Sequence, residues 1–276
     1  MARVLILSSY VAASRVGGGA QALALARLGI EPILVPTVLY GRHPGHGPPG
    51  GAAVEADVFE AMLGGVETQG LFAGLDAAIT GHFSSAEQVA ITAEALARVK
   101  RASPAARVIV DPIMGDEDKG LYVREPVAEA LAAELVPDAD ILAPNAWELA
   151  RLSGQPVSDA ASAVSATRAL GRPTLVSSLI EGDGIGVAYI DAREAWLAVH
   201  QRRRTAPKGT GDLLTAIFAA ALVLGRAPRE ALAIAVGAVA EAVEDAAPLG
   251  KIELAISVLP TALKFSPRVT IRRLDG

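Results

Sequence analysis

The sequence predicts an α/β fold in which helices cover both faces of a largely parallel sheet. Short apolar runs bounded by turn residues alternate with Ala- and Leu-rich segments of helical spacing. This alternation is typical of sheets built from strand–helix–strand units. The 276 residues are 51% hydrophobic, which suffices for one large domain over residues 1–276 but not for a second one. Sheets of this kind bind ligands at the carboxyl ends of their strands.

The expected strands recur along the first two thirds of the chain, at 4–7, 32–35, 77–80, 108–111, 141–143 and 174–177. Helical spacing lies between them, at 20–28, 86–102, 126–135 and 160–170. Segments 186–190 and 195–200, joined by a polar turn, predict an antiparallel hairpin at one edge of the sheet. From Asp212 onward the chain is expected to be mostly helical and to end in a short polar tail.

Segment 41–51 contains five glycines and three prolines. This composition excludes a helix or an inner strand, so a loop is expected. Long loops in compact domains are often functional. A substrate flap and a tolerated surface insertion are both compatible with the sequence.

Composition restricts the partners and the compartment. The formal net charge of -5 gives no electrostatic reason to expect nucleic acid binding, so small-molecule partners are favoured. The absence of cysteine excludes disulfides and thiolate metal sites and suits a reducing cytoplasm. No segment approaches the roughly 18 to 20 apolar residues that span a bilayer, and the N-terminus lacks the features of a signal peptide. A soluble cytoplasmic protein is expected.

Segment 208–212, with the sequence Lys-Gly-Thr-Gly-Asp, leads directly into the apolar segment 213–224. Gly209 and Gly211 leave backbone N–H groups uncovered, and a following helix adds the positive end of its dipole, which together form an anion pocket. Asp212 would place a carboxylate at the mouth of this pocket, where it can take a proton from an attacking hydroxyl. The pattern favours phosphoryl transfer to an alcohol. A glycine turn with Asp212 as helix N-cap is the alternative.

Two other strand ends carry oxygen-bearing side chains. Asp111 closes an expected strand and is followed by Pro112, which ends it. Asn145 and Glu148 follow the next strand and share one face of the first helical turn. Asn145 is the only asparagine of the chain, which favours a function for it. Oxygen ligands without a nearby histidine suit magnesium carried on a nucleotide.

Structural roles are the alternatives at these positions. Asp111 could cap a turn, and the spacing of Asn145 and Glu148 is also that of a capping box. The four histidines, at positions 43, 46, 82 and 200, are scattered, although the first three follow early strands and could meet in one site. The chain lacks a Walker phosphate-binding loop, a dinucleotide fingerprint, and the HExxH and GxSxG motifs.

Together these motifs resemble those of the pyridoxal kinases of the ribokinase-like superfamily, over nearly the whole length. The superfamily is indicated by Ala-Pro-Asn at 143–145 with Glu148, by Val-Ser-Ser at 176–178 and by Gly-Thr-Gly-Asp at 209–212. The vitamin B6 branch is indicated by Ser-Tyr-Val at 9–11 and Asp-Pro-Ile-Met-Gly-Asp at 111–116. The resemblance implies a three-layer αβα sandwich with a mostly parallel central sheet and an antiparallel edge hairpin. It also implies ATP and a divalent ion as cofactors, frequent activation by potassium, and a homodimer.

The resemblance also implies roles for individual residues. Asp212 would deprotonate the 5′-hydroxymethyl group of the vitamer, in an anion hole made by Gly209, Thr210 and Gly211. Magnesium and phosphates would be held, mostly through water, by Asp111, Asn145 and Glu148, with Asp111 and Glu148 as the metal-side carboxylates. ATP would also be lined by Ala143, Ser177, Thr205, Ala206, Pro207 and Lys208. The acceptor would be contacted by Ser9, Val11, Thr37, Pro44, Gly45 and His82.

The chain departs from the family pattern at three places. It has Ser-Arg-Val-Gly-Gly at 14–18 where the family has Gly-x-x-Gly-Asn, Pro-Gly-His at 44–46 where Thr and Tyr are usual, and Gly-His at 81–82 where Gly-Tyr is usual. All three lie on the acceptor side, which leaves two alternatives to a B6 kinase. One is a kinase of another hydroxymethyl heterocycle such as hydroxymethylpyrimidine, although that family commonly has a cysteine in its anion hole. The other is a non-catalytic B6 binder, which would not need Asp212.

Overall fold

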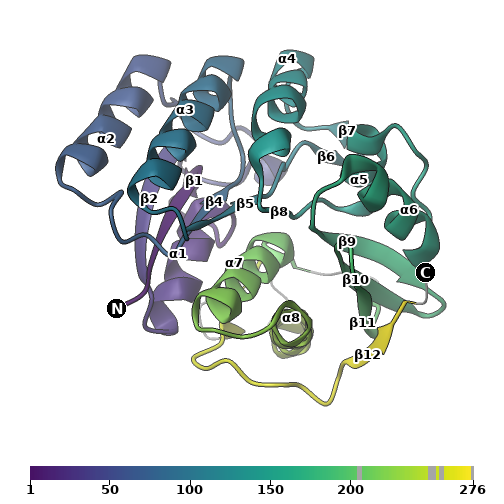
Figure 1. Cartoon of the computed structure of the whole chain (residues 1–276). Coiled ribbons are helices and arrows are strands. Elements are labelled where there is room, and N and C mark those ends of the chain that lie inside the picture. Colours follow the sequence, from purple (N-terminus) through teal and green to yellow (C-terminus); the bar gives the residue numbers. More distant parts are fainter. Residues whose placement is uncertain (204–206, 248–252, 255–257, 275–276) are drawn as a thin grey trace.

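The computed structural model describes residues 1–203, 207–247, 253–254 and 258–274. Its fold has three layers around a central sheet (Figure 1). One face is covered by α1 (Gly17–Arg27), α7 (Thr210–Val223) and α8 (Pro228–Ala246), and the other by α2 (Ala56–Thr68), α3 (Ala86–Ala102) and α4 (Glu125–Ala130). Strand β1 (Arg3–Val11) supplies Val4 and Ile6 to the first layer and Leu5 and Leu7 to the second, as the alternation of side chains along a strand requires. The predicted fold class is confirmed.

The main sheet of the described chain has ten strands in the order β12-β11-β10-β9-β8-β5-β4-β1-β2-β3. The strands after β1 are β2 (Glu31–Tyr40), β3 (Gly51–Ala53), β4 (Ala77–Thr80), β5 (Arg107–Val110), β8 (Ile141–Leu142), β9 (Thr174–Glu181), β10 (Gly184–Ile190), β11 (Ala195–Gln201) and β12 (Thr270–Arg273). The six strands from β2 to β9 in this order are parallel. The predicted hairpin of β10 and β11 is antiparallel. A separate small hairpin joins β6 (Gly115–Asp116) to β7 (Gly120–Leu121).

Helix α3 shows how local sequence sets the helix boundaries. Ser85 caps it, since its Oγ accepts a hydrogen bond from the backbone N–H of Gln88 at 3.2 Å. Its buried side chains, from Val89 to Val99, recur at helical spacing and face the sheet. Helices α5 (Ala146–Ser153) and α6 (Ala160–Leu170) pack beside β9 and β10 in the same way. The predicted segments 86–102 and 160–170 coincide with α3 and α6.

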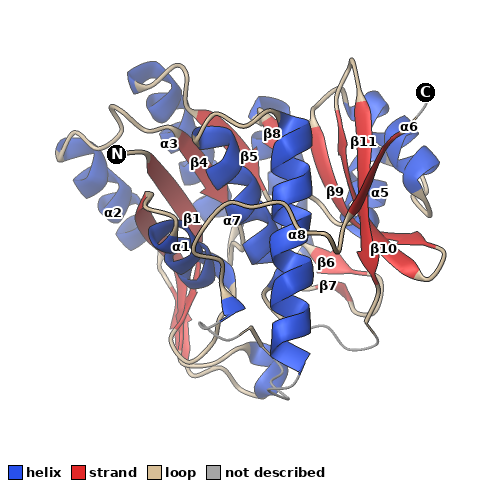
Figure 2. Cartoon of the chain, turned by 90° about the horizontal axis from the view of Figure 1, so that it is seen from below, coloured by secondary structure: helices blue, strands red, loops and turns tan. Residues whose placement is uncertain are grey.

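Helix α7 is buried almost all round. The ten residues from Leu213 to Leu222 are each at most 6% exposed, because the helix lies between the sheet and α8 (Figure 2). A helix that is apolar on every side belongs in such a position. Among the described residues, none of the helices is both long and apolar enough to cross a bilayer.

Two stretches differ from the sequence prediction. The helix expected at 126–135 is α-helical only to Ala130 and continues as a π-helical turn, Leu131–Leu135, and a 3-10 turn, Val136–Asp138. Pro137 explains the change, since it lacks the N–H that a continued helix requires and crowds the preceding turn. The tail is also not only polar, because it contains β12, which pairs with β11. This strand has four residues, of which only Ile271 is apolar. It is too short to show the alternation of apolar and polar residues by which a strand is recognised in a sequence.

Candidate active site

The predicted site residues gather at one edge of the sheet, because the parallel strands all end there. Asp111 follows β5, Asn145 follows β8, and Ser177 lies in β9 and forms a bridge with Asn145. Asp212 reaches the same edge from the first turn of α7. The charges of Glu148 and of Asp212 both contribute to the raised pKa of Asp111, after the larger effect of burial. This edge is the crevice in which such sheets bind ligands.

The anion hole takes the predicted form. Gly209 is the N-cap of α7 and has a φ of 94°, in the left-handed region that glycine adopts without strain. A Cβ at this position would clash with the carbonyl oxygen of Arg15. The first-turn N–H groups of α7 have no acceptors within the helix, and the helix dipole adds to their positive potential. Asp212 lies inside the helix, so the alternative in which it is the N-cap is excluded.

Asp212 has the properties of a general base. Its Oδ1 is buried and lacks a hydrogen-bond partner among the described residues. Burial raises the pKa of Asp212 to about 6, although backbone N–H groups of Gly17 and of Asp212 itself lower it. A buried oxygen without a partner is costly and is rare in folded proteins. This oxygen is therefore available to a proton donor that arrives with a substrate, and its pKa suits proton transfer near neutral pH.

Asp111 is buried at 7% exposure, and its Oδ2 accepts a hydrogen bond from Thr215 Oγ1 at 2.8 Å. Burial, followed by the charges of Glu148 and Asp212, raises the pKa of Asp111 well above its usual range. Thr215 was not predicted from the sequence. It lies three residues after Asp212, so helical spacing places both on one face of α7 and could have identified it.

The donor set fits magnesium held mainly by phosphate. Asp111 and Asp212 supply carboxylate oxygens. Burial, followed by the charges of Glu148 and Asp212, raises the pKa of Asp111, and a cation beside it would offset both effects. Within the part of the chain that is described, histidine, cysteine and acidic side chains do not form a metal-binding group of three or more. An ion that keeps its waters and takes one or two carboxylates along with substrate phosphates needs no such group.

Asn145 and Glu148 form the capping box that the sequence analysis gave as the alternative to a functional role. Asn145 Oδ1 accepts from the Glu148 N–H, and Glu148 Oε2 accepts from the Asn145 N–H, both at 2.9 Å. Glu148 Oε1 also accepts from the N–H groups of Met114 at 2.7 Å and Gly115 at 3.2 Å. Glu148 is 3% exposed, and burial raises its pKa to about 7. Both oxygens are thus engaged with backbone, so its geometry gives no support to the expected role in holding magnesium.

The expected ATP-side residues lie on two segments. Ala143, which is 8% exposed, directly follows β8, and Ser177 lies in β9. Pro207 and Lys208 precede the anion hole in the sequence. Thr205 and Ala206 lie outside the described residues. Burial and the neighbouring Lys119 ammonium lower the pKa of Lys208. Two ammonium groups this close together form a positive region suited to a phosphate chain.

Ser9 and Val11, on the acceptor side, are buried at the end of β1. Thr37 is fully buried, and its hydroxyl donates to the carbonyl oxygen of His82 at 2.6 Å. Thr37 therefore supports His82 in this structure and lines no open space, in contrast to the contact expected for it. Burial, with a smaller contribution from His43, lowers the pKa of His82 to about 4, so its imidazole is neutral near pH 7.

Segment 41–51 forms an ordered hairpin that joins β2 to β3. It contains a 3-10 turn, Pro44–His46, in which Pro44 and Gly45 are exposed. The rings of His43 and His46 are 5.9 Å apart, and the charge of His43 makes the smaller contribution to the lowered pKa of His82. His46 Nε2 lies 2.8 Å from Oε1 of Glu253, a contact that no sequence signal predicted.

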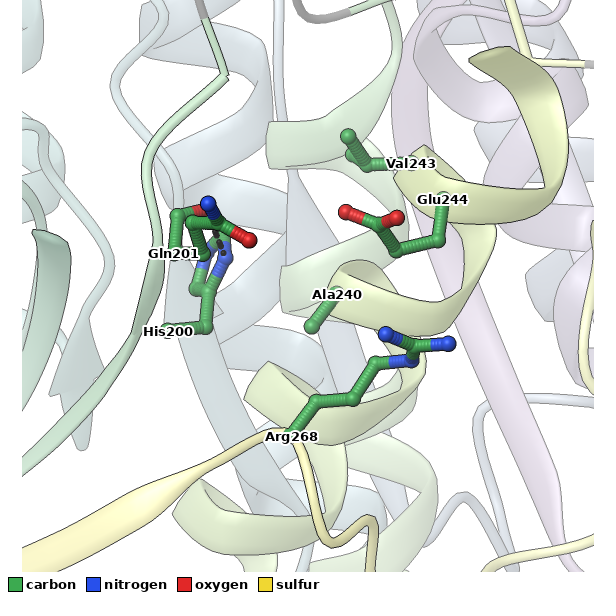
Figure 3. A pocket seen from close by; sticks show the side chains of 6 residues that line it. All are labelled: His200, Gln201, Ala240, Val243, Glu244 and Arg268. Atoms are coloured by element: carbon green, nitrogen blue, oxygen red, sulfur yellow. Dashed lines mark hydrogen bonds between the residues drawn. The ribbon is translucent and has the colours of Figure 1, made fainter. Parts of the chain in front are cut away.

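A cavity of about 140 Å³ lies between β11 and the last turns of α8 (Figure 3). Its lining residues are His200, Gln201, Ala240, Val243, Glu244 and Arg268. The carboxylate of Glu244 binds the guanidinium of Arg203 through two contacts of 2.6 Å. The cavity lies at the end of β11, the strand that precedes the anion hole in the sequence.

Comparison with known proteins identifies the family. A family model described as phosphomethylpyrimidine kinase matches residues 49–257. A pyridoxine/pyridoxal/pyridoxamine kinase from Bordetella avium is 39% identical over 230 residues, which cover 80% of this chain and 78% of that protein. The chain belongs to the pyridoxal kinase family. A pyridoxal kinase from Rubrobacter xylanophilus is 32% identical over 281 residues, covering 98% of this chain and 97% of its own length.

The solved structures agree with membership of the pyridoxal kinase family. The crystal structure of the pyridoxal kinase from Entamoeba histolytica is 27% identical, with a TM-score of 0.89 over 99% of this chain and 100% of that chain. The expected ribokinase-like architecture of the pyridoxal kinases, with its mostly parallel sheet and antiparallel edge hairpin, is therefore confirmed.

Proposed function

We propose that this chain is an ATP-dependent kinase that phosphorylates the 5′-hydroxymethyl group of pyridoxal, or of a related B6 vitamer, to give pyridoxal 5′-phosphate. The observation that carries the proposal is the buried, unpartnered Oδ1 of Asp212 in the first turn of α7, beside the left-handed Gly209. Membership of the pyridoxal kinase family supports the acceptor class.

The residues divide the reaction between them. Asp212 accepts the proton of the acceptor hydroxyl, which then attacks the terminal phosphorus of ATP, while ADP leaves. The N–H groups of Gly209, Thr210 and Gly211 stabilise the charge of the transferring phosphoryl group, and Lys208 attracts the phosphate chain. Positioning and charge stabilisation of this kind are the main sources of catalysis in phosphoryl transfer.

Magnesium is the second cofactor of the proposal. Asp111 would face it through water, with Asn145 beside it on the phosphate side, and the ion would neutralise phosphate charge when bound. Glu148 would act through its hydrogen bonds to the backbone of Met114 and Gly115. We also propose that potassium raises the rate, as the resemblance to the family implies. Exchange of potassium for choline chloride at constant ionic strength tests this.

The cavity of Figure 3 offers a place for the nucleotide base. Helices α7 and α8 are joined by the short segment 224–227, so they run antiparallel, and the last turns of α8 lie near the anion hole. Ala240→Leu would fill the cavity with an apolar side chain. The KM for ATP should rise about tenfold, corresponding to roughly 1.4 kcal/mol, while the KM for pyridoxal stays unchanged.

Ala247→Leu is the control for this change, because it adds the same side chain at an exposed position just beyond α8. An unchanged KM for ATP in Ala240→Leu would place the base elsewhere.

The acceptor is tested directly by steady-state kinetics with pyridoxal, pyridoxine, pyridoxamine and hydroxymethylpyrimidine. We expect turnover of pyridoxal and a lower KM for it in His82→Tyr, because the tyrosine restores the aromatic surface usual in the family. Each lost contact to a polar ring costs on the order of 1 kcal/mol. Turnover of the pyrimidine alone would assign the other heterocycle. Binding of vitamers without turnover of any acceptor would indicate a non-catalytic binder.

We further propose that residues 1–276 act as one kinase domain, in a cytoplasmic homodimer. The main sheet supports the first point, since it includes strands from both β1 and β12. The absence of cysteine fits a reducing compartment. Exposed Tyr10 and Leu39, neighbours on β1 and β2, offer apolar surface to a second copy. Light scattering of the purified protein measures the oligomeric state.

A further inference from the structure

The turn that follows β5 has an unusual backbone. Ile113 has a φ of 37°, and β-branched residues rarely adopt a positive φ because their Cβ crowds the backbone. A conformation of this kind persists only where the surroundings hold it, and such residues cluster at functional sites. The turn lies between Asp111, in the site, and the β6–β7 hairpin.

Two side chains at the N-terminus of α5 hydrogen-bond to the backbone that follows Ile113. Glu148 Oε1 accepts hydrogen bonds from the N–H groups of Met114 and Gly115, at 2.7 and 3.2 Å. Asn145 Nδ2 donates to the carbonyl oxygen of Gly115 at 2.8 Å. Gly115 is closely packed as well, since a Cβ there would clash with the backbone of Gly120. Three hydrogen bonds from two side chains thus fix the backbone at 114–115.

This turn begins directly after Asp111, so its backbone sets the direction in which the Asp111 side chain leaves the chain. Thr215 donates a hydrogen bond to Oδ2 of Asp111 at 2.8 Å. The carboxylate is therefore held by Thr215 from α7 and by the backbone of the turn. A shift of the backbone at 114–115 would displace Asp111 relative to Thr215.

We propose that Glu148 is a positioning residue that holds the turn 112–115, and through it Asp111, in place for phosphoryl transfer and does not itself bind magnesium. Its oxygens accept three backbone N–H groups, from Met114, Gly115 and Asn145, and it is 3% exposed. The inference rests on the proposed function, because it assumes that Asp111 acts on the magnesium and phosphates of the nucleotide. The contacts of Glu148 are independent of that function.

Glu148→Gln tests the proposal, because it keeps the size of the side chain and replaces one accepting oxygen with a donor. We expect kcat to fall by about 10- to 100-fold, the usual cost of losing a group that orients a site residue. The magnesium concentration for half-maximal rate should stay within about twofold of wild type. In the protein without ligands, the amides of Met114 and Gly115 should exchange with solvent faster.

The chain supplies a matched control in Glu230. It has the same third position in α8, where its Oε2 accepts from the Ala227 N–H at 3.3 Å at an exposed position. Glu230→Gln makes the same substitution at a helix N-terminus outside the site, so kcat and the exchange of residues 114–115 should not change. If Glu148→Gln does not fold, Asn145→Ser replaces it, since serine can cap α5 but cannot donate to Gly115.

Two results would overturn the proposal. A raised magnesium requirement, with kcat restored at high magnesium, would make Glu148 a metal residue. An unchanged kcat together with unchanged amide exchange would make it only a helix cap. The exchange measurement needs no substrate, so a failure of the proposed kinase activity in wild type is seen separately.

Discussion

Replacement of Asp212 with alanine is expected to lower kcat by roughly two to four orders of magnitude, the usual range for a lost acid or base. Nucleotide affinity should change little, since the anion hole consists of backbone N–H groups. The folded state should not be weakened, because Oδ1 of Asp212 is buried without a partner and its pKa is raised. Steady-state kinetics, nucleotide titration and urea unfolding measure the three quantities.

Asp57→Ala is the control, because Asp57 occupies the first turn of α2, away from the site. It should leave kcat unchanged. Turnover by Asp212→Ala within threefold of wild type would contradict the assignment of Asp212 as the base.

The rate should also follow the ionisation of Asp212. Because the base must be deprotonated, kcat/KM is expected to rise with pH through about 6, the pKa to which burial raises this carboxyl. The effect on stability has the opposite sign. An acid whose pKa is raised on folding contributes stability below its unfolded pKa, and this contribution is lost as pH rises through about 6. A pH profile without an acid limb between roughly pH 5 and 7 would contradict this ionisation.

Gly209→Ala is expected to have the second largest effect, a loss in kcat of about 10²- to 10³-fold, which is typical when a donor of an oxyanion hole is displaced. The φ of 94° is unfavourable for alanine, and the new Cβ would clash with the carbonyl oxygen of Arg15. The N-terminus of α7 must then move. Stopped-flow or steady-state assays measure the rate, and thermal unfolding measures the stability.

Gly171→Ala separates backbone strain from loss of the anion hole. Gly171 also has a positive φ, of 66°, at the end of α6, but its added Cβ would meet no atom within 4 Å. This variant should lose about 1 kcal/mol of stability and keep its kcat. Equal kcat values for the two variants would show that Gly209 is needed only because glycine adopts a positive φ without strain, and that the anion hole does not depend on it.

The elements that carry the chemistry could be predicted from sequence because their signals are local. Gly209 and Asp212 adjoin an apolar helix, and Asp111 and Asn145 each lie next to a proline at the end of a strand. Local pattern is the information that a single sequence holds best. It also gave the exact bounds of α3 and α6.

Contacts between distant segments could not be predicted in this way. The hydrogen bonds of Glu148 to the backbone at 114–115 join residues more than thirty positions apart. Their donors are main-chain N–H groups, which have no sequence signature. The bond between His46 and Glu253 spans 207 positions. Local pattern also missed α2, which contains Gly64 and Gly65 in its interior, where glycine disfavours a helix.

The burial of α7 has a consequence for how this protein can change over evolutionary time. The helix that presents Asp212 packs on all sides, so most substitutions in it would cost folding stability as well as activity. The hairpin with Pro44 and Gly45 is exposed and can accumulate changes at little cost to the core. Selection can therefore retune which alcohol is accepted while the chemistry of transfer is inherited unchanged.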